Sequence, residues 1–315
     1  MIADTTTILL VGTGAVGGYY GGRLAQAGAR VSALCRSDYD EVKKKGISVS
    51  SISGDFHFSP DRVIRDSDGY HDEPDYLIVA VKALPDIDLP ALIGGGVGIR
   101  TSIVLLQNGI DIEDQIASSF PENELISALA FICASRPRYG HVEHQDFGKI
   151  AIGRYPSGTS EKVERLAGLF SRTVVPCSVE NDIVLARWKK LLWNAPLNPI
   201  SVLTGGANTK EIMESGPALD LVRGVMEEVI LLAENAGKHV PRSLIDDNIR
   251  DTLAMKPFKT SMLQDFEEKR PMEVESILGN ALRIARRQGA PVPRLESLYG
   301  LLSLADSMIR KGPRT

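Results

Sequence analysis

Three polar residues recur at four-residue spacing within a stretch that is otherwise apolar on most sides: Lys190, Asn194 and Asn198. Such a stretch is typical of a central helix. Each step of four residues turns an α-helix by only about 40°, so the three side chains form one polar stripe. Because burying a lysine and two asparagines is costly, we expect the stripe to face a cleft or a ligand. The alternative is a solvated helix edge, to which the neighbouring Arg187 and Lys189 could also belong.

A second chemical signal is the G-x-G-x-x-G spacing of Gly12, Gly14 and Gly17, directly after an apolar run at residues 8–11. In such loops the first glycine allows a tight turn, the second lets the backbone approach a pyrophosphate, and the third lets the next helix pack close to the strand. The N-terminus of that helix attracts phosphates. We therefore predict a dinucleotide site whose loop residues are Gly12, Gly14, Ala15, Val16 and Gly17.

The residue after the second strand indicates which dinucleotide is bound. The predicted helix ends at Gly28, and a strand at residues 30–35 completes a βαβ unit. NAD sites usually place an acidic residue here to bind the ribose 2′-OH. This chain has Arg36, and a guanidinium can pair with a 2′-phosphate. We expect NADP(H); the alternative is a solvated arginine with Asp38 close by.

Two further strands end in polar residues. An apolar run at residues 76–81 is followed by Lys82, and another at residues 103–106 is followed by Gln107, Asn108 and Gly109. In open parallel sheets, ligands bind outside the carboxyl ends of the strands. We therefore expect Lys82 and Asn108 to lie at the binding edge of the sheet.

The remaining elements suggest where the chain divides. A hairpin is predicted at residues 47–58, strands at 125–133 and 147–153 with a polar connection at 140–146, a helix at 160–170, and a last strand at 173–177. Beyond residue 179 the pattern is helical, with a break near Pro199 among others. We predict an α/β Rossmann domain at residues 1–179 and an all-helical domain at residues 180–315.

Composition excludes several classes of protein. A chain of 315 residues is long enough for two domains, and 43% hydrophobic with 24% charged residues is ordinary for a soluble enzyme. The net charge of -4 offers no general attraction to nucleic acid or anionic membrane. Three separated cysteines argue against a disulfide framework and for a reducing compartment. With no leader pattern and no apolar run of membrane-spanning length, we expect a cytoplasmic protein.

The polar segment at residues 259–273 has no assignment on its own. Ser261 could be a helix N-cap, and Glu273 could be a first-turn acid that complements the helix dipole. The histidines lack a supporting carboxylate or cysteine spacing, so we predict no metal site.

Taken together, the motifs resemble the ketopantoate reductase (2-dehydropantoate 2-reductase) family over nearly the full length. The glycine motif is shared with many oxidoreductases, whereas the stripe from Lys190 to Asn198, then Ser261-Met-Leu-Gln-Asp265, then Glu273, is far more specific. The resemblance implies a Rossmann domain followed by a helical domain like the C-terminal domain of 6-phosphogluconate dehydrogenase. It also implies reduction of 2-dehydropantoate by NADPH, which gives pantoate for pantothenate and coenzyme A synthesis.

The resemblance also implies roles in the chemical step. Carried over by motif position, Lys190 bonds the ketone oxygen and supplies its proton, Glu273 assists that transfer, and Ser261 holds the substrate carboxylate. A cation aimed at the oxygen agrees with the negative charge that hydride addition develops there. A partly buried cleft would lower the pKa of the lysine toward working pH.

Further positions are carried over in the same way. Asn194 and Asn198 would bind polar groups of the substrate, with Asn208 a weaker candidate. Asn108 would lie between the nicotinamide ribose and the substrate, and Lys82 would lie near the reacting end of the cofactor.

Two departures from the family pattern bear on the substrate. Phe258 and Leu278 stand where the family commonly has asparagine, and Phe258 makes the pocket less polar. The alternatives are therefore reduction of another branched 2-oxo acid, or a non-enzymatic NADP(H)-sensing module, against which Lys190 and Glu273 argue. We expect a small-molecule 2-oxo acid as partner, no nucleic acid or membrane, and leave a homodimer through the helical domain open.

Overall fold

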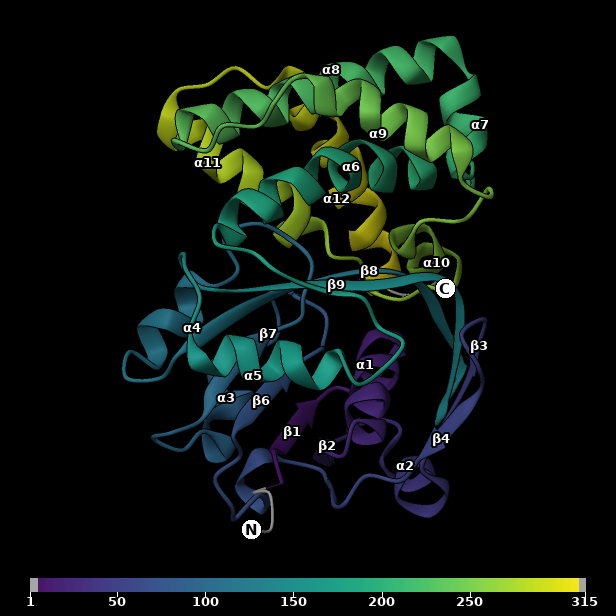
Figure 1. The fold of residues 1–315 in the computed structure, drawn as a ribbon. Coiled ribbons are helices and arrows are strands. Elements are labelled where there is room, and N and C mark those ends of the chain that lie inside the picture. The colour runs from purple at the N-terminus through teal and green to yellow at the C-terminus, as the bar shows by residue number, and fades with distance from the viewer. Residues whose placement is uncertain (1–4, 312–315) are drawn as a thin grey trace. The chain divides into compact units, whose positions relative to one another are not determined.

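The computed structural model describes residues 5–311, and the chain divides into two compact units (Figure 1). The first unit consists of Met1–Lys82, Asp86–Gln107 and Glu113–Ile183. The second consists of Val184–Thr315 together with two short segments, Ala83–Pro85 and Asn108–Ile112. The sequence did not indicate that these two segments pack with the helices.

The first unit is built on one mixed sheet with the strand order β4-β3-β9-β8-β7-β6-β1-β2-β5, and β10 pairs with β9. Its strands are β1 Thr7–Val11, β2 Arg30–Leu34, β3 Ile47–Ser51, β4 Phe56–Phe58, β5 Val63–Ile64, β6 Tyr76–Val79, β7 Ser102–Leu105, β8 Leu125–Arg138, β9 His141–Arg154 and β10 Cys177–Val179. The neighbours β2, β1, β6, β7 and β8 are parallel, whereas β8 with β9 and β3 with β4 are antiparallel.

Helices cover both faces of this sheet. They are α1 Ala15–Gln26, α2 Tyr39–Lys45, α3 Leu89–Ile93, α4 Asp114–Ser119 and α5 Glu161–Phe170. Alternate residues of β1 point to opposite faces. Ile8 and Leu10 pack in a cluster with α1 and α5, whereas Leu9 and Val11 pack in another with α3 and α4. A parallel sheet covered on both faces is the Rossmann arrangement, as predicted.

Three strand predictions are wrong in their bounds. The strand predicted at residues 125–133 continues to Arg138 as β8. The polar residues 140–146 are not a connection: all but Gly140 belong to β9, which forms a long hairpin with β8. Val142 and His144 point inward and are buried there, so the period of two was hidden by a polar side chain in the core. The last strand is Cys177–Val179 rather than residues 173–177.

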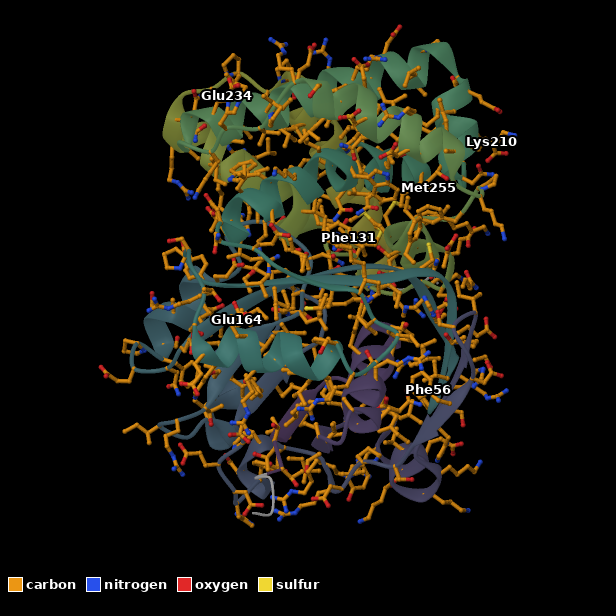
Figure 2. All side chains as sticks on the ribbon, in the orientation of Figure 1. Phe56, Phe131, Glu164, Lys210, Glu234 and Met255 are labelled. Carbon is orange, nitrogen blue, oxygen red and sulfur yellow. The ribbon has the colours of Figure 1, made fainter. Side chains whose placement is uncertain are left out.

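The second unit is helical. It contains α6 Ile183–Leu203, α7 Thr209–Glu214, α8 Gly216–Asn235, α9 Ser243–Ala254, α10 Ser261–Glu267, the π-helical turn η3 Glu275–Gly279, α11 Asn280–Gln288 and α12 Pro293–Lys311. Their apolar side chains fill the interior of this unit (Figure 2). Within residues 5–311, none of the helices combines the length and apolar character needed to cross a membrane.

The expected break near Pro199 is also wrong, because α6 continues through Pro196 and Pro199 to Leu203. Each proline removes one N–H donor from the helix and strains it. Leu197 and Ile200 are both buried in the helical core, so packing on either side of Pro199 outweighs the local penalty.

Candidate active site

The glycine loop lies between β1 and α1 and has the backbone geometry of a tight turn. Gly12 has φ +100°, and a Cβ there would lie 2.7 Å from a side-chain carbon of Val81. A Cβ on Gly17 would lie 2.0 Å from the Gly12 carbonyl oxygen, so helix and strand approach too closely for any side chain. A Cβ on Gly14 would meet no protein atom within 4 Å. The protein's own packing therefore requires glycine at the first and third positions but not at the second.

The region after β2 holds Arg36 on the surface and Asp38 in the interior. Arg36 is exposed, two residues beyond the end of the strand. Asp38 is only 4% exposed, and its Oδ2 accepts hydrogen bonds from Thr13 Oγ1 at 2.6 Å and from Arg136 Nη1 at 2.9 Å. The acidic neighbour that could have paired with Arg36 is therefore bound to a different arginine.

In the helical unit, three residues far apart in the sequence form one hydrogen-bonded chain. Lys190 Nζ donates to Asn108 Oδ1 at 2.8 Å, and Asn108 Nδ2 donates to Glu273 Oε2 at 3.0 Å. The other oxygen, Glu273 Oε1, accepts from the backbone N–H of Ala83 at 3.0 Å. Asn108 thus presents its oxygen to the ammonium and its amide N–H to the carboxylate. The lysine and the glutamate are coupled through this amide.

Glu273 is held from both sides along the chain. Its neighbours Met272 and Val274 are buried in the helical core. The backbone N–H of Met272 donates to Asp306 Oδ1 at 2.8 Å, and Asp306 is a buried carboxylate on α12 that also pairs with Arg310. The backbone before the glutamate is therefore fixed, which limits where its carboxylate can point.

The segment that carries Asn108 is fixed against η3 and α6. Gly109 has φ +117°, and a Cβ there would lie 2.5 Å from the carbonyl oxygen of Ser276. Ile110 N–H donates to that same oxygen at 3.0 Å, and Arg187 Nη1 donates to the Gly109 carbonyl at 3.1 Å. Only glycine allows this approach, which explains why glycine follows Asn108 in the sequence.

Lys190 has a strongly perturbed acidity. Burial, followed by the positive charge of Arg187, lowers the pKa of Lys190 to about 7, while the negative charge of Glu273 opposes this change. Desolvation disfavours the charged ammonium, and a like charge nearby does the same. A lysine near half-protonation at neutral pH can both give and regain a proton, which suits a general acid.

The other two members of the stripe are buried, as expected for residues that do not form a solvated edge. Asn194 is 8% and Asn198 is 2% exposed. Among the described residues, Asn198 Oδ1 is buried and has no hydrogen-bond partner. An unpaired buried amide oxygen is costly, so it is suited to accept a hydrogen bond from a ligand.

The solvated-edge alternative is wrong for Arg187 and correct for Lys189. Arg187 is 2% exposed, whereas Lys189 is exposed on α6. Arg187 lies one turn before Lys190 and contributes to its low pKa. An arginine on an otherwise apolar helix was the sign in the sequence that Arg187 could be buried. The sequence did not show that its partner is the carbonyl oxygen of Gly109.

Asn208 and Ser261, two further predicted substrate residues, lie at the starts of α7 and α10. Asn208 is the N-cap of α7, and its side-chain oxygen accepts from the N–H groups of Lys210 and Glu211. Ser261 is exposed at the first position of α10 and is not the N-cap, because Thr260 accepts from the helix with its own side chain. Lys82, at the last position of its segment in the first unit, is partly buried.

Phe258, the departure from the family pattern, stacks on Trp193. The two rings are parallel within 6°, with centroids 5.7 Å apart. Trp193 precedes Asn194 on α6, and its indole N–H donates to Thr252 Oγ1 at 3.0 Å. Stacked aromatic rings of this kind stabilise each other by about 1 kcal/mol beyond their buried area. The pair therefore forms a rigid apolar element on the helix that carries the stripe.

The sequence did not indicate the residues that position the hydrogen-bonded chain from Lys190 to Glu273. Ala83 contributes through its backbone N–H, Asp306 through the backbone of Met272, and Arg187 through its charge. A backbone donor carries no residue-type signal, and Asp306 lies in an ordinary helical pattern. Within the described part of the chain, no group of three or more His, Cys, Asp or Glu residues could hold a metal ion.

Comparisons with known proteins agree with this arrangement over both units. The family model described as ketopantoate reductase PanE/ApbA matches residues 8–157, and the model of its C-terminal region matches residues 182–306. A 2-dehydropantoate 2-reductase of Nostoc sp. is 35% identical over 316 residues, which cover 97% of each chain.

Two solved structures of similar proteins are closely related in sequence and fold. A 2-dehydropantoate 2-reductase from Methylococcus capsulatus has a TM-score of 0.91 and 41% identity, with 98% of each chain covered. Another from Geobacter metallireducens has a TM-score of 0.89 and 34% identity, covering 95% of this chain and 99% of that one. On both sequence and structure, this chain belongs to the ketopantoate reductase family of dinucleotide-binding reductases.

Proposed function

We propose that the protein reduces the ketone of 2-dehydropantoate with NADPH, giving pantoate for pantothenate and coenzyme A synthesis. The observation that carries the proposal is the hydrogen-bonded chain from Lys190 through Asn108 to Glu273, together with the pKa of about 7 of that lysine. Relatives that cover nearly the whole chain are named for this reaction.

Lys190 is the proposed proton donor. Bound NADPH supplies a hydride to the carbonyl carbon. The carbonyl oxygen gains negative charge as this happens, and the ammonium of Lys190 stabilises that charge more strongly in the transition state than in the ground state. Transfer of its proton to the oxygen completes the hydroxyl and leaves a neutral amine. A pKa of about 7 makes both this transfer and reprotonation from solvent accessible at neutral pH.

Asn108 and Glu273 keep the lysine in the state and place that this step needs. The carboxylate raises the lysine pKa against the opposing effects of burial and Arg187, so that a useful fraction stays protonated. The amide of Asn108, oriented by the carboxylate, fixes one proton of the ammonium. Glu273 acts on the lysine through charge and through this amide.

The proposed cofactor is NADPH, the dinucleotide that carries a 2′-phosphate. At Gly14, where a Cβ would meet no protein atom, the backbone is open to the pyrophosphate, with Ala15 and Val16 beginning the helix that follows. Arg36 is exposed at the end of β2 and is suited to a 2′-phosphate. Lys82 is proposed to lie near the reacting end of the cofactor.

Substrate recognition is proposed for the polar residues of the helical unit. Asn198 offers a buried acceptor oxygen, and Asn194 lies one turn before it on α6. Ser261 has an exposed hydroxyl that can donate to the substrate carboxylate. The capping bonds of Asn208 make it the weakest of these candidates.

A second candidate is reduction of another branched 2-oxo acid, which the stacked pair of Phe258 and Trp193 favours. A ring in place of an amide removes polar partners for a substrate hydroxyl. Initial rates with a series of 2-oxo acids and NADPH distinguish the two. A much higher kcat/KM for an acid that lacks the hydroxyl would replace 2-dehydropantoate as the substrate, and turnover of no 2-oxo acid would favour the NADP(H)-sensing alternative.

Three further predictions accompany this function. Cytoplasmic location and domains at residues 1–179 and 180–315 stay predictions. A homodimer through the helical domain also stays a prediction; a ketopantoate reductase from Staphylococcus aureus, 20% identical in sequence, is described as dimeric. Sedimentation of the full chain would test the dimer.

The decisive experiment replaces Lys190 by alanine. General acid catalysis typically contributes 10²- to 10⁴-fold, so kcat should fall by about that factor. NADPH affinity, measured by fluorescence titration, should stay nearly unchanged. The matched control is Lys189→Ala, which removes the same charge from an exposed position on the same helix and should leave both quantities unaltered. A normal kcat in Lys190→Ala, or loss of cofactor affinity alone, would contradict the assignment.

A further inference from the structure

The carboxylate of Asp38 is directed into the protein rather than toward its own helix. Asp38 immediately precedes α2, where an aspartate commonly caps the helix, yet it makes no side-chain cap bond there. Instead, Oδ2 is shared by Thr13 of the glycine loop and Arg136 near the end of β8. Its side chain is 5% exposed and that of Arg136 is 25% exposed. A residue 98 positions away thus provides the counter-charge of this buried acid.

This acid lies where it would affect coenzyme choice. It follows Arg36 by two residues and is bonded to the loop between Gly12 and Gly14. An acidic side chain at the end of the second strand accepts hydrogen bonds from a ribose 2′-OH and so favours NAD(H). The same carboxylate repels a 2′-phosphate.

We propose that Arg136 is a specificity-determining residue for the coenzyme, because it neutralises Asp38 and holds its carboxylate away from the ribose. This rests on the NADPH part of the proposed function. Arg36 can then bind the 2′-phosphate without competition from Asp38. A guanidinium has five N–H donors, so Arg136 can hold the Asp38 carboxylate while a quarter of its own side chain stays exposed.

The effect of removing Arg136 follows from the negative charge of Asp38, which would lose its positive partner. A 2′-phosphate carries nearly two negative charges. With its counter-charge removed, the Asp38 carboxylate should repel this group, and at an effective dielectric constant between that of a protein surface and that of water we expect NADPH binding to weaken about tenfold. NADH lacks this group, so its affinity should change little or improve. The quantity to measure is the ratio of the two dissociation constants.

The experiment is a double-mutant cycle with R136M, D38N and R136M/D38N. Dissociation constants for NADPH and NADH are measured by fluorescence titration, which does not require turnover of any 2-oxo acid. R136M should shift the ratio toward NADH by about tenfold, D38N should not, and the double variant should return close to the wild-type ratio. R136K keeps the charge and should stay within about threefold of wild type. The matched control is R138M, which removes an exposed arginine on the same strand.

The outcomes separate this proposal from its structural alternative. If R136M weakens NADPH and NADH equally, and D38N does not restore the ratio, then Arg136 only stabilises the hairpin and the proposal is wrong. The double variant removes both members of the buried pair, so it gives a folded test even if R136M is unstable. A wild type that prefers NADH would instead refute the NADPH assignment itself. If the protein turned over no 2-oxo acid, the proposed reaction would be wrong, but the ratio of the two coenzyme dissociation constants could still be measured and would still test the role of Arg136.

Discussion

Replacing Glu273 by glutamine removes one negative charge while keeping the size of the side chain. In the wild type this charge raises the pKa of Lys190 against burial and Arg187. Without it, the pKa should fall below 7, and less of the lysine is protonated at neutral pH. Because the protonated lysine is the proposed acid in ketone reduction, the alkaline limb of the pH profile of kcat/KM should move toward lower pH.

The size of this shift follows from the geometry. The two charges are separated by hydrogen bonds of 2.8 and 3.0 Å and one amide group. At a separation of about 8 Å and an effective dielectric constant of about 20 to 40, their attraction is roughly 1 to 2 kcal/mol. That corresponds to a shift of about one pH unit. On the alkaline side, kcat/KM of Glu273→Gln should therefore be about tenfold below wild type, with a smaller loss on the acid side.

The assay follows NADPH oxidation at substrate concentrations below KM across the neutral and alkaline range, since kcat/KM reports the free enzyme. The matched control is Glu296→Gln, the same chemical change at an exposed position of α12. An unchanged inflection, or one moved to higher pH, would show that the carboxylate does not act on the lysine. A uniform loss at every pH would indicate that Glu273 only shapes the site.

Three other substitutions test separate parts of the structure. Lys190→Met should raise the melting temperature, most strongly at and below pH 7. The pKa of Lys190 is about 7 in the folded state and about 10.5 in the unfolded state, so the unfolded state of the wild type binds more protons and wild-type stability rises between these pH values. Below pH 7, burying the charged lysine costs the wild type at most about 5 kcal/mol, and methionine removes this cost. Equal gains at pH 6 and above pH 10 would contradict this. Asp306→Asn should lower kcat severalfold without changing NADPH affinity, because the backbone N–H of Met272 loses its charged acceptor; equal losses in both would indicate general unfolding, which circular dichroism would reveal. Phe258→Asn should shift the ratio of kcat/KM toward hydroxylated 2-oxo acids, and an unaltered ratio would place the ring stacked on Trp193 outside the substrate site.

Local patterns were sufficient for much of the fold. The apolar run before Gly12 and the glycine spacing predict a strand, a tight turn and a helix, because each depends on residues within a few positions of one another. The structure has these elements as β1 and α1. The polar stripe on α6 was also local, since helical periodicity alone brings Lys190, Asn194 and Asn198 onto one face.

Patterns failed where tertiary packing overrode local preference. A break was expected near Pro199, yet α6 continues because buried residues on both sides hold it. The strand β9 was partly missed because His144 is a polar residue in the core, where it bonds Ser51 Oγ and backbone carbonyls. Ser51 lies 93 positions away in the sequence, so local alternation alone could not identify His144 as a core residue of the strand.

The sequence by itself determined which chemical groups are available: a glycine-rich loop after the first strand, an arginine after the second strand, and a lysine among amides on an apolar helix. Only the tertiary structure decided how these groups are connected. Asn108 meets Glu273 across 165 positions, and Asp38 meets Arg136 across 98. The physical reason is that periodicity and turn preference act over a few residues, whereas the charge and hydrogen bonds that set a pKa or a coenzyme preference depend on which distant segments the completed core brings into contact.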